Sequence, residues 1–225
     1  TVSAAKTILH SLNENDNISI VTYSQDAITL FENTPCTPEN KQMIDDGLDT
    51  LKPTYNTNMW GGIIRSLDIL QSTSPPERMK GVLLLTDGIP NVEPPRGHEY
   101  MLEKYFKDHN FKCMISCYGF GYNLLSELLM NLSDISGGDG YSFIPDASLL
   151  GNIFIHGLSN LFTTAIYNPS LSIQLKNNIR FKDNGKYSQV ININSIKYGQ
   201  DKNILIQLDT SSSPDRSQDF ISSSI

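Results

Sequence analysis

The spacing of apolar residues divides the chain into two parts. Up to about residue 165, stretches with an apolar residue at every third or fourth position alternate with short continuous apolar runs. The first pattern is typical of amphipathic helices and the second of strands buried in a parallel sheet. From Asn168 onward, apolar and polar residues alternate singly, as in Ser170–Leu175, which predicts antiparallel strands with one face in water.

The order of these elements predicts the fold class and the domains. Strands that alternate with amphipathic helices indicate an α/β domain with a doubly wound, mostly parallel sheet over residues 1–165. We expect residues 166–210 to form a partial antiparallel β domain of the sandwich type, because a few short strands rarely close a sandwich. The Ser-rich residues 211–225 are expected to be a disordered or truncated tail.

Local signals predict individual elements near the start of the chain. Val2–Leu12 has apolar residues at helical spacing, so the sequence opens inside a helix. Ile18–Tyr23 and Ala27–Phe31 are separated by a short polar turn and predict a hairpin. Thr37 followed by Pro38 predicts a helix start, with Thr37 as the N-cap residue.

The most informative run is Val82–Leu85, which leads directly into Thr86, Asp87 and Gly88. An unbroken apolar run of this kind predicts a strand that is buried on both faces. In open α/β sheets, ligands bind beyond the carboxyl ends of such strands. Asp87 is therefore the best-placed candidate for a functional residue, and the alternative is that it only caps the loop.

Composition narrows the classes of function. The net charge is −7 and the basic residues are scattered, which argues against nucleic-acid binding. The three cysteines match neither a zinc motif nor a redox motif, so we expect free thiols and a cytoplasmic location. No apolar run approaches the roughly 18 residues of a membrane span.

The loop that contains Thr57 adds a second polar group near Asp87. It precedes a helical stripe that begins at Trp60, two elements before Asp87 in chain order. In a doubly wound sheet both loops can lie at the same carboxyl edge. A hydroxyl and a carboxylate there suit a hard divalent cation such as Mg²⁺, which prefers oxygen ligands.

Thr57–Ile63 followed by Leu83–Gly88 resembles a von Willebrand factor A (vWA) domain. The resemblance covers roughly residues 1–165 and implies a Rossmann-like fold with a metal-ion-dependent adhesion site (MIDAS). By motif, the metal ligands from the family's second and third loops are Thr57 and Asp87. The Tyr55-Asn56 pair replaces the Gly-rich lead-in that is common in the family.

The resemblance also implies metal ligands from a first loop, which comes before the first helix in the family. The family's first loop, Asp-x-Ser-x-Ser, follows the first strand and supplies three of five ligating side chains. We expect no such motif anywhere in this chain, and the first strand and its loop are expected upstream of the opening helix. We therefore expect Mg²⁺ (or Mn²⁺) as cofactor only if the parent protein carries that loop upstream. The alternative is a domain that has lost its metal site.

A narrower resemblance involves three later stretches: Gly138–Asp146, Leu158–Thr164 and Tyr198–Gln200. They resemble vWA proteins that continue into a β-rich segment and then a Hint (self-splicing type) domain. No Hint nucleophile or zinc-ligand cluster occurs in this chain. The resemblance therefore implies a Hint-associated, multidomain fragment without Hint chemistry.

Three functions remain open from the sequence. The first is a metal-dependent protein–protein interaction module, in which an acidic residue of a protein partner completes the metal shell. Asn58 and Ser24 would support the ligands there, or would only form hydrogen bonds within their loops. The second is a metal-free structural scaffold.

The third function, a metal-dependent hydrolase, needs a nucleophile or a base beside Asp87. The histidines do not supply one, because each is better explained as a surface or packing residue: His10, His98, His109 and His156. We therefore expect no enzymatic activity.

Overall fold

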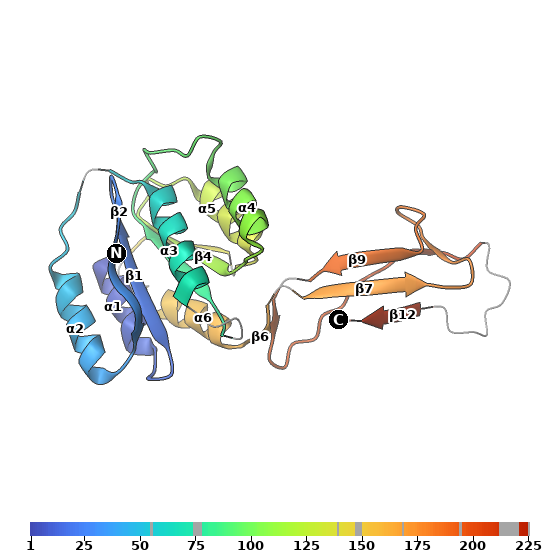
Figure 1. The fold of residues 1–225 in the computed structure, drawn as a ribbon, viewed down its shortest axis with the longest axis horizontal. Coiled ribbons are helices and arrows are strands. Elements are labelled where there is room, and N and C mark those ends of the chain that lie inside the picture. The colour runs from blue at the N-terminus through green and yellow to red at the C-terminus, as the bar shows by residue number, and fades with distance from the viewer. Residues whose placement is uncertain are drawn as a thin grey trace. The chain divides into compact units, whose positions relative to one another are not determined.

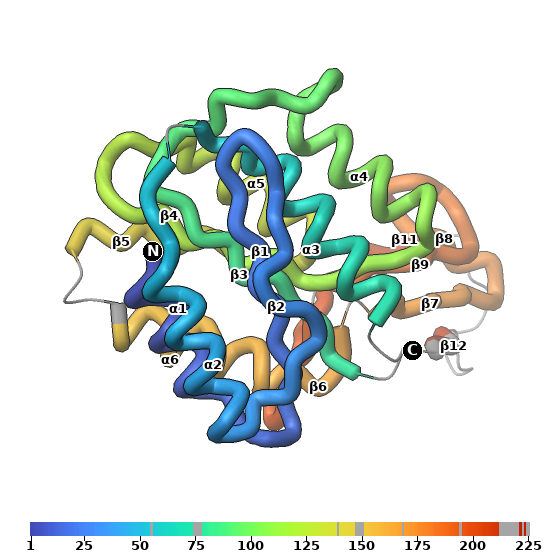
Figure 2. The backbone as a smooth tube through the Cα atoms, turned by 60° about the vertical axis from the view of Figure 1, so that its left-hand side comes forward, coloured from blue at the N-terminus to red at the C-terminus, as the bar shows by residue number. Residues whose placement is uncertain are grey.

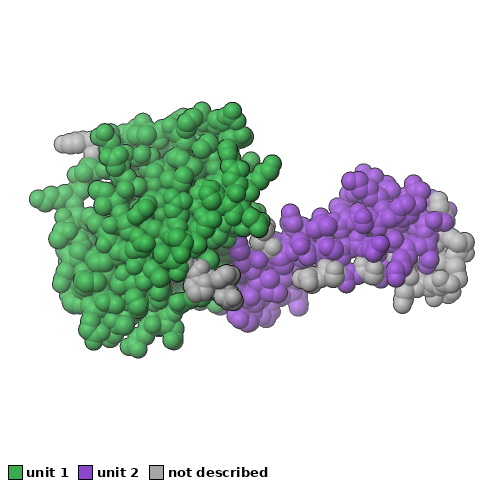
Figure 3. Space-filling model, viewed as in Figure 1, with its two compact units in different colours: residues 1–162 green, residues 163–225 purple. Residues whose placement is uncertain are grey.

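The computed structural model describes residues 1–225 apart from 55, 74–77, 139, 147–149, 168, 194, 212–220 and 225. The chain forms two compact units, Thr1–Phe162 and Thr163–Ile225 (Figures 1 and 3). The first unit, called unit 1, contains the helices and the parallel sheet. The second, called unit 2, contains short antiparallel strands.

Unit 1 alternates helices and strands in the predicted order. Its helices are α1 (Val2–Ser11), α2 (Pro38–Asp49), α3 (Met59–Thr73), α4 (His98–His109), α5 (Ser126–Ser136) and α6 (Leu150–Phe162). Its strands are β1 (Asn17–Tyr23), β2 (Ala27–Pro35), β3 (Gly81–Thr86), β4 (Met114–Phe120) and β5 (Tyr141–Ile144).

The parallel sheet has the order β3-β4-β5, with β4 in the centre. Gly81 pairs with Met114 and Cys117 pairs with Tyr141, so the three strands end at one edge of the sheet. The first six residues of β4 are buried. A strand that has neighbours on both sides and helices on both faces is shielded from water, which explains the burial of β4.

Helices cover both faces of this sheet (Figure 2). On one face, residues of α3, α4 and α5 pack against Val82, Leu84, Ile115 and Cys117. On the other face, residues of α1 and α6 pack against Tyr118 and Ile144. α2 packs beside α1 through Ile44 and Leu48. This arrangement confirms the predicted doubly wound α/β fold.

The hairpin and the first helix start agree with the sequence. β1 and β2 pair antiparallel, from Asn17 with Pro35 to Tyr23 with Ala27. At α2, the Thr37 side chain accepts a hydrogen bond from the Asn40 amide. The cap satisfies a backbone donor that the first helical turn leaves free.

β3 differs from its prediction. Its residues alternate between half-buried and buried, with Val82, Leu84 and Thr86 buried. The sequence predicts burial on both faces, but Leu83 and Leu85 are only half-buried. The physical reason is a cavity beside them, because both side chains line it.

Unit 2 is built from short strands of two to six residues, which pair antiparallel. They are β6 (Thr164–Ile166), β7 (Ser170–Leu175), β8 (Arg180–Phe181), β9 (Ser188–Asn192), β10 (Ile196–Lys197), β11 (Leu208–Asp209) and β12 (Ile221–Ser224). β7 lies between β12 and β9, and the other strands form two-stranded pairs. A small core gathers Ile173, Leu175, Ile179 and Phe181.

One stretch of unit 2 differs from the pattern of the sequence. Ile204–Leu208, whose apolar residues also predict a strand, contributes only Leu208 to one, since its partner β8 is two residues long. Within residues 211–225, predicted to be a disordered or truncated tail, Ile221–Ser224 form β12 and pair with β7. The rest of that tail lies outside the described residues, except for Ser211.

Among the described residues, none of the helices has both the length and the apolar character needed to cross a membrane.

The packing of α6 yields a matched pair of substitutions. Phe154 is fully buried, with its ring 4.7 Å from that of Tyr118, whereas the next residue, Ile155, is 58% exposed. Phe154→Ala should lower the free energy of unfolding by about 3–5 kcal/mol, because it leaves a cavity in the core. Ile155→Ala should change it by about 0.5 kcal/mol or less. Urea unfolding curves measure both, and equal losses would contradict this packing.

The three cysteines are buried and unpaired, and burial raises their pKa values, to about 12 for Cys113 and Cys117. The native thiols should therefore react slowly with a thiol reagent at about pH 8, and all three should react at once in denaturant. Cys113 and Cys117 have higher pKa values in the folded protein than in the unfolded chain, so their contribution to the free energy of unfolding is full below about pH 9. That contribution should be lost as the pH rises toward 12. Rapid labelling of the native protein would contradict the buried placement.

Candidate metal centre

β1 and β3 end on the same side of unit 1, at the edge called here the rim. Tyr23, the last residue of β1, donates its hydroxyl hydrogen bond to the Leu85 carbonyl of β3 at 2.7 Å. The chain continues from β1 into the turn at Ser24 and from β3 into Asp87. The rim therefore brings together loops that are far apart in the sequence.

The loop before α3 is tied to the loop after β3 by a pair of hydrogen bonds. The Thr57 amide donates to Asn91 Oδ1 at 2.9 Å, and the Asn91 amide donates to the Thr57 carbonyl at 3.3 Å. A Cβ atom built on Gly88 would lie 3.7 Å from Thr57 Oγ1. The Thr57 hydroxyl thus lies against the turn that Asp87 and Gly88 form, and the structure brings the two predicted ligands to one place.

The Asp87 side chain is exposed and Thr57 is half-buried. Thr86 Oγ1 donates to the Gly88 carbonyl at 3.1 Å, which closes the turn on which Asp87 lies. Burial, with a smaller contribution from the negative charge of Asp87, raises the pKa of Tyr23 to about 12 against a hydrogen bond with Thr86 that lowers it.

Hydrogen bonds join the loop of Asn58 to the turn that contains Ser24. Asn58 Oδ1 accepts from the Gly61 amide at 2.9 Å and so caps α3, while its Nδ2 donates to the Gln25 carbonyl at 2.9 Å. The Asn58 amide donates to the Ser24 carbonyl at 2.7 Å. These bonds fasten the α3 loop to the turn of the hairpin, and they hold Thr57 in place.

The donor set suits part of an oxygen shell around a hard cation. Thr57 and Asp87 supply a hydroxyl and a carboxylate, which are the donors that Mg²⁺ and Mn²⁺ accept. Among the described residues, no group of three or more His, Cys, Asp or Glu side chains is placed to hold a metal. The two residues therefore fit a metal as partial ligands and need further oxygen donors.

One stretch of the sequence, Asp209–Ser213, does match Asp-x-Ser-x-Ser. It lies in unit 2, where Asp209 belongs to β11 and pairs with Arg180. Hydrogen bonds from the Ser211 side chain and from the Ser211 amide, the latter at 3.0 Å, lower the pKa of the Asp209 carboxyl. Residues 212 and 213 lie outside the described part of the chain.

Trp60, His98 and His10 have packing or hydrogen-bond partners of their own. Trp60 is half-buried and packs against the core under α3. His98 is the first residue of α4 and is buried, which lowers its pKa. His10 contacts Asp45 at 2.7 Å between α1 and α2. These placements agree with packing and surface roles.

Sequence reasoning missed two residues that build the rim, Asn91 and Tyr23. Asn91 reads as one more polar residue in a Pro-rich loop, and its pairing with Thr57 spans 34 residues. Tyr23 reads as the last residue of a strand. A weak signal for Tyr23 is Gly62, whose absent Cβ would lie 2.6 Å from Tyr23 Cδ1. Tyr55 of the Thr57 loop lies outside the described residues.

Comparison with solved structures places the fold among known ones. A von Willebrand factor type A protein from Catenulispora acidiphila matches with a TM-score of 0.69 at 16% identity, over 80% of this chain and 42% of that one. The ArnB paralog VWA2 from Sulfolobus acidocaldarius matches with a TM-score of 0.55 at 21% identity, over 87% of this chain and 47% of that one. At these identities the likeness shows the fold.

A third structure bears on the metal. Proximal thread matrix protein 1 from the mussel byssus, with a zinc-occupied MIDAS motif, matches with a TM-score of 0.54 at 17% identity. The matched region is 70% of this chain and 41% of the byssus protein. The zinc is a property of that protein.

Sequence comparison shows the family. The uncharacterized protein YfbK of Escherichia coli strain K12 is 31% identical over 153 residues, which are 65% of this chain and 25% of YfbK. The chain thus spans a quarter of that relative's length. A family model described as the von Willebrand factor type A domain matches residues 1–142. That match stops before unit 2, so the Hint association stays a prediction. The chain belongs to the von Willebrand factor type A family.

Proposed function

We propose that unit 1 is a metal-ion-dependent protein–protein interaction module. Thr57 and Asp87 hold a divalent cation, Mg²⁺ or Mn²⁺, at the rim. An acidic residue of a protein partner fills an open coordination position on that cation. The bound ion would be the largest local charge and would supply the attraction for the partner's carboxylate.

The observation that carries this proposal is the contact between two distant loops. The hydrogen-bond pair between Thr57 and Asn91 fixes a hydroxyl oxygen against the Asp87–Gly88 turn. Asp87 remains exposed at that point, although carboxylates in a structural network are usually paired. A fixed hydroxyl beside an unshielded carboxylate is a favourable start for a cation site.

Apolar side chains near the rim favour a protein as the partner. Ile89 and Val92, on the loop that follows Asp87, are 40% and 37% exposed. Tyr122 follows the end of β4 and Phe143 lies near the end of β5, with ring centroids 5.5 Å apart and exposures of 85% and 40%. Aromatic and apolar groups around a charged contact are typical of protein interfaces.

The remaining ligands come, in this proposal, from residues of the longer protein outside this chain. The chain covers a quarter of YfbK and 42% of the Catenulispora acidiphila structure. A metal-free scaffold and a hydrolase remain the alternatives, and the geometry of Thr57 and Asp87 favours neither of them.

Cation binding tests the proposal directly. In the natural protein that includes the residues before Thr1, Asp87→Asn should weaken Mn²⁺ binding by about tenfold or more, equal to about 1.4 kcal/mol, because it removes a charged ligand. Thr57→Ala should weaken binding as well, and Thr57→Ser should restore it, because Ser keeps the hydroxyl. Titration followed by the paramagnetism of free and bound Mn²⁺ measures all three.

The matched control is Asp46→Asn, on the exposed face of α2, where the carboxylate contacts Gln42. It removes the same charge far from the rim and should leave Mn²⁺ binding unchanged. Equal weakening by Asp46→Asn and Asp87→Asn would indicate a nonspecific charge effect. Unchanged binding in Asp87→Asn would exclude the proposed site.

Asn91 provides a second test, as a residue that positions Thr57. Asn91→Ala removes the acceptor of the Thr57 amide and should cost about 1 kcal/mol of stability or less, since the bond is exposed. Hydrogen exchange at the Thr57 amide should become faster, and Mn²⁺ affinity should fall with it. Asn56→Ala changes an exposed residue of the same loop and is the control. Identical exchange at Thr57 in both variants would contradict the positioning role.

A further inference from the structure

The imidazole of His98 is buried, and one of its nitrogens has no hydrogen-bond partner. His98 is the first residue of α4 and is 4% exposed. Among the described residues, none accepts from or donates to its Nε2 atom, which is itself shielded from solvent. Buried polar atoms usually have a partner, because burial removes the hydrogen bonds that water would supply. The position therefore tolerates a neutral ring much better than a charged one.

The face of α4 that carries His98 belongs to the core of unit 1. Leu102 lies one turn further along on the same face and is fully buried. Leu102 belongs to the same core cluster as Leu129 and Leu132 of α5. His98 therefore extends an apolar face to the very start of the helix, and its burial anchors the first turn.

The first turn of α4 lacks a side-chain cap. Gly97 occupies the N-cap position with a φ of +77°, and no side chain caps the helix there. The Gly97 amide donates to the Pro94 carbonyl at 3.1 Å, and the Met101 amide donates to the Gly97 carbonyl at 3.3 Å. The first amides of a helix have no acceptor within the helix. The packing of His98 is therefore a large part of what keeps this turn closed.

Two opposing influences act on the ring. Burial lowers the pKa of His98, while the charges of Glu93, in the loop before α4, and Glu99, in its first turn, raise it by less. A positive ring at this place would also lie at the positive end of the α4 helix dipole. The buried position thus disfavours protonation, whereas carboxylates close to it would attract a protonated ring.

The helices packed against α4 have their own contacts with it. α5 meets the first turn with the neutral side chain of Asn131, whose Nδ2 donates to Glu99 at 2.6 Å. α3 offers Asp68, which accepts from the Tyr105 hydroxyl at 2.7 Å, two turns past His98. The carboxylate of Asp68 is therefore engaged at another part of the helix.

The start of α4 is also the end of the loop that fixes the rim. Residues 88–97 connect the turn after β3 to α4, as the green loop at the top of Figure 2 shows. Asn91 lies on this loop and forms two hydrogen bonds with the Thr57 backbone. The loop is held by β3 at one end and by the first turn of α4 at the other. Movement of that turn therefore changes how Asn91 is held.

We propose that His98 is a pH-sensitive switch for the rim. In the closed form the neutral ring is buried, the first turn of α4 is formed and Asn91 holds Thr57. Uptake of one proton makes both ring nitrogens donors, so Nε2 becomes a charged donor without an acceptor. In the open form the charged ring has moved to water and to the exposed carboxylate of Glu93. The first turn of α4 is then released, and the hydrogen bonds between Asn91 and Thr57 weaken.

The direction of the pH effect follows from the burial of the ring. Burial holds the pKa of His98 below its ordinary value, so the closed form binds fewer protons than the open form. The stability of the closed form is therefore full above about pH 6.5 and is lost as the pH falls toward the pKa of the buried ring. Ordinary carboxyl groups have pKa values of about 4, so acidification to about pH 5.5 protonates few of them.

Hydrogen exchange in the metal-free natural protein tests the switch. Exchange at the imidazole Cε1 position, followed by mass spectrometry, gives the pKa of each histidine, and that of His98 should lie below its ordinary value. Amide exchange on peptides that contain Met101 or Thr57 reports opening of the turn and of the rim. Protection of both amides, corrected for the intrinsic effect of pH, should fall about three- to tenfold between about pH 6.5 and 5.5.

Three variants separate the switch from general effects of acid. His98→Leu removes the titrating group and keeps an apolar side chain at the start of α4, so protection should no longer depend on pH in this range. His98→Gln is the second variant, because it keeps a polar side chain that does not titrate. His10→Leu is the matched control, since α1 covers the opposite face of the sheet, and it should keep the pH dependence of the natural protein.

The switch would be overturned by a His98 pKa at or above its ordinary value, or by unchanged protection of Met101 down to about pH 5.5. A pH dependence that persists in both His98 variants would also overturn it, as would a loss at Met101 without a loss at Thr57. The switch requires no metal, and only its effect on cation binding rests on the function proposed above. Mn²⁺ titration at about pH 7.5, where the closed form prevails, tests the metal site separately, so either proposal can fail without the other.

Discussion

The architecture of unit 1 depends on burial of β4, which has strands on both sides and helices on both faces. Its apolar residues cannot reach water, so α3, α4 and α5 must close one face while α1 and α6 close the other. Parallel strands covered in this way end at one edge, and their loops meet there. The rim is thus a consequence of how the core is built, and Thr57 and Asp87 lie on it because their loops follow elements that the core positions.

The rim itself depends on polar contacts between loops. Asn58 caps α3 and binds the hairpin turn, and Asn91 binds the Thr57 backbone. These bonds hold a hydroxyl near a carboxylate that has been left exposed. A divalent cation benefits from such an arrangement because the ligands are fixed before it binds, and less order has to be created on binding. This geometry is the basis of the function proposed for the rim.

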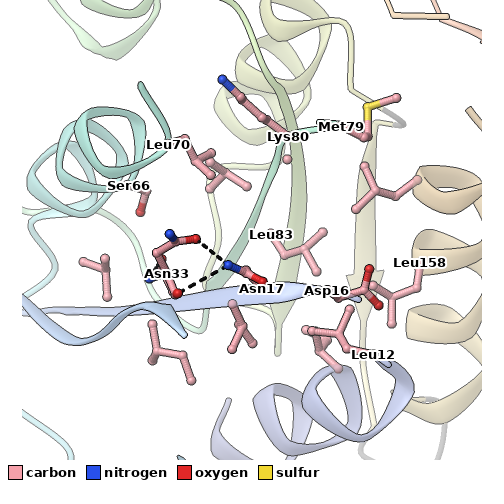
Figure 4. Close-up of a pocket in the computed structure, with 18 of the residues that line it drawn as sticks. Leu12, Asp16, Asn17, Asn33, Ser66, Leu70, Met79, Lys80, Leu83 and Leu158 are labelled. Atoms are coloured by element: carbon pink, nitrogen blue, oxygen red, sulfur yellow. Dashed lines mark hydrogen bonds between the residues drawn. The ribbon is translucent and has the colours of Figure 1, made fainter. Parts of the chain in front are cut away.

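A cavity lies beside the rim, between β1 and β3 (Figure 4). Side chains from both helical layers line it, together with Leu83 and Leu85 of β3. Tyr23, packed on Gly62 and bonded to Leu85, joins the two strands at the rim.

The sequence by itself determined the α/β class, the order of elements in unit 1, the Thr37 cap and the pairing of Thr57 with Asp87 as candidate ligands. These depend on local periodicity and short motifs, which are visible in the chain. Only the tertiary structure decided that Asn91 holds Thr57, that Leu83 and Leu85 border a cavity, and that Leu208 alone of the stretch Ile204–Leu208 belongs to a strand. Each of these depends on residues far away in the chain: β8 is too short to pair with more of that stretch, and residues of α1, β1 and α6 form the rest of the cavity beside Leu83. Local pattern reports what a segment favours, and the contacts between segments decide what it becomes.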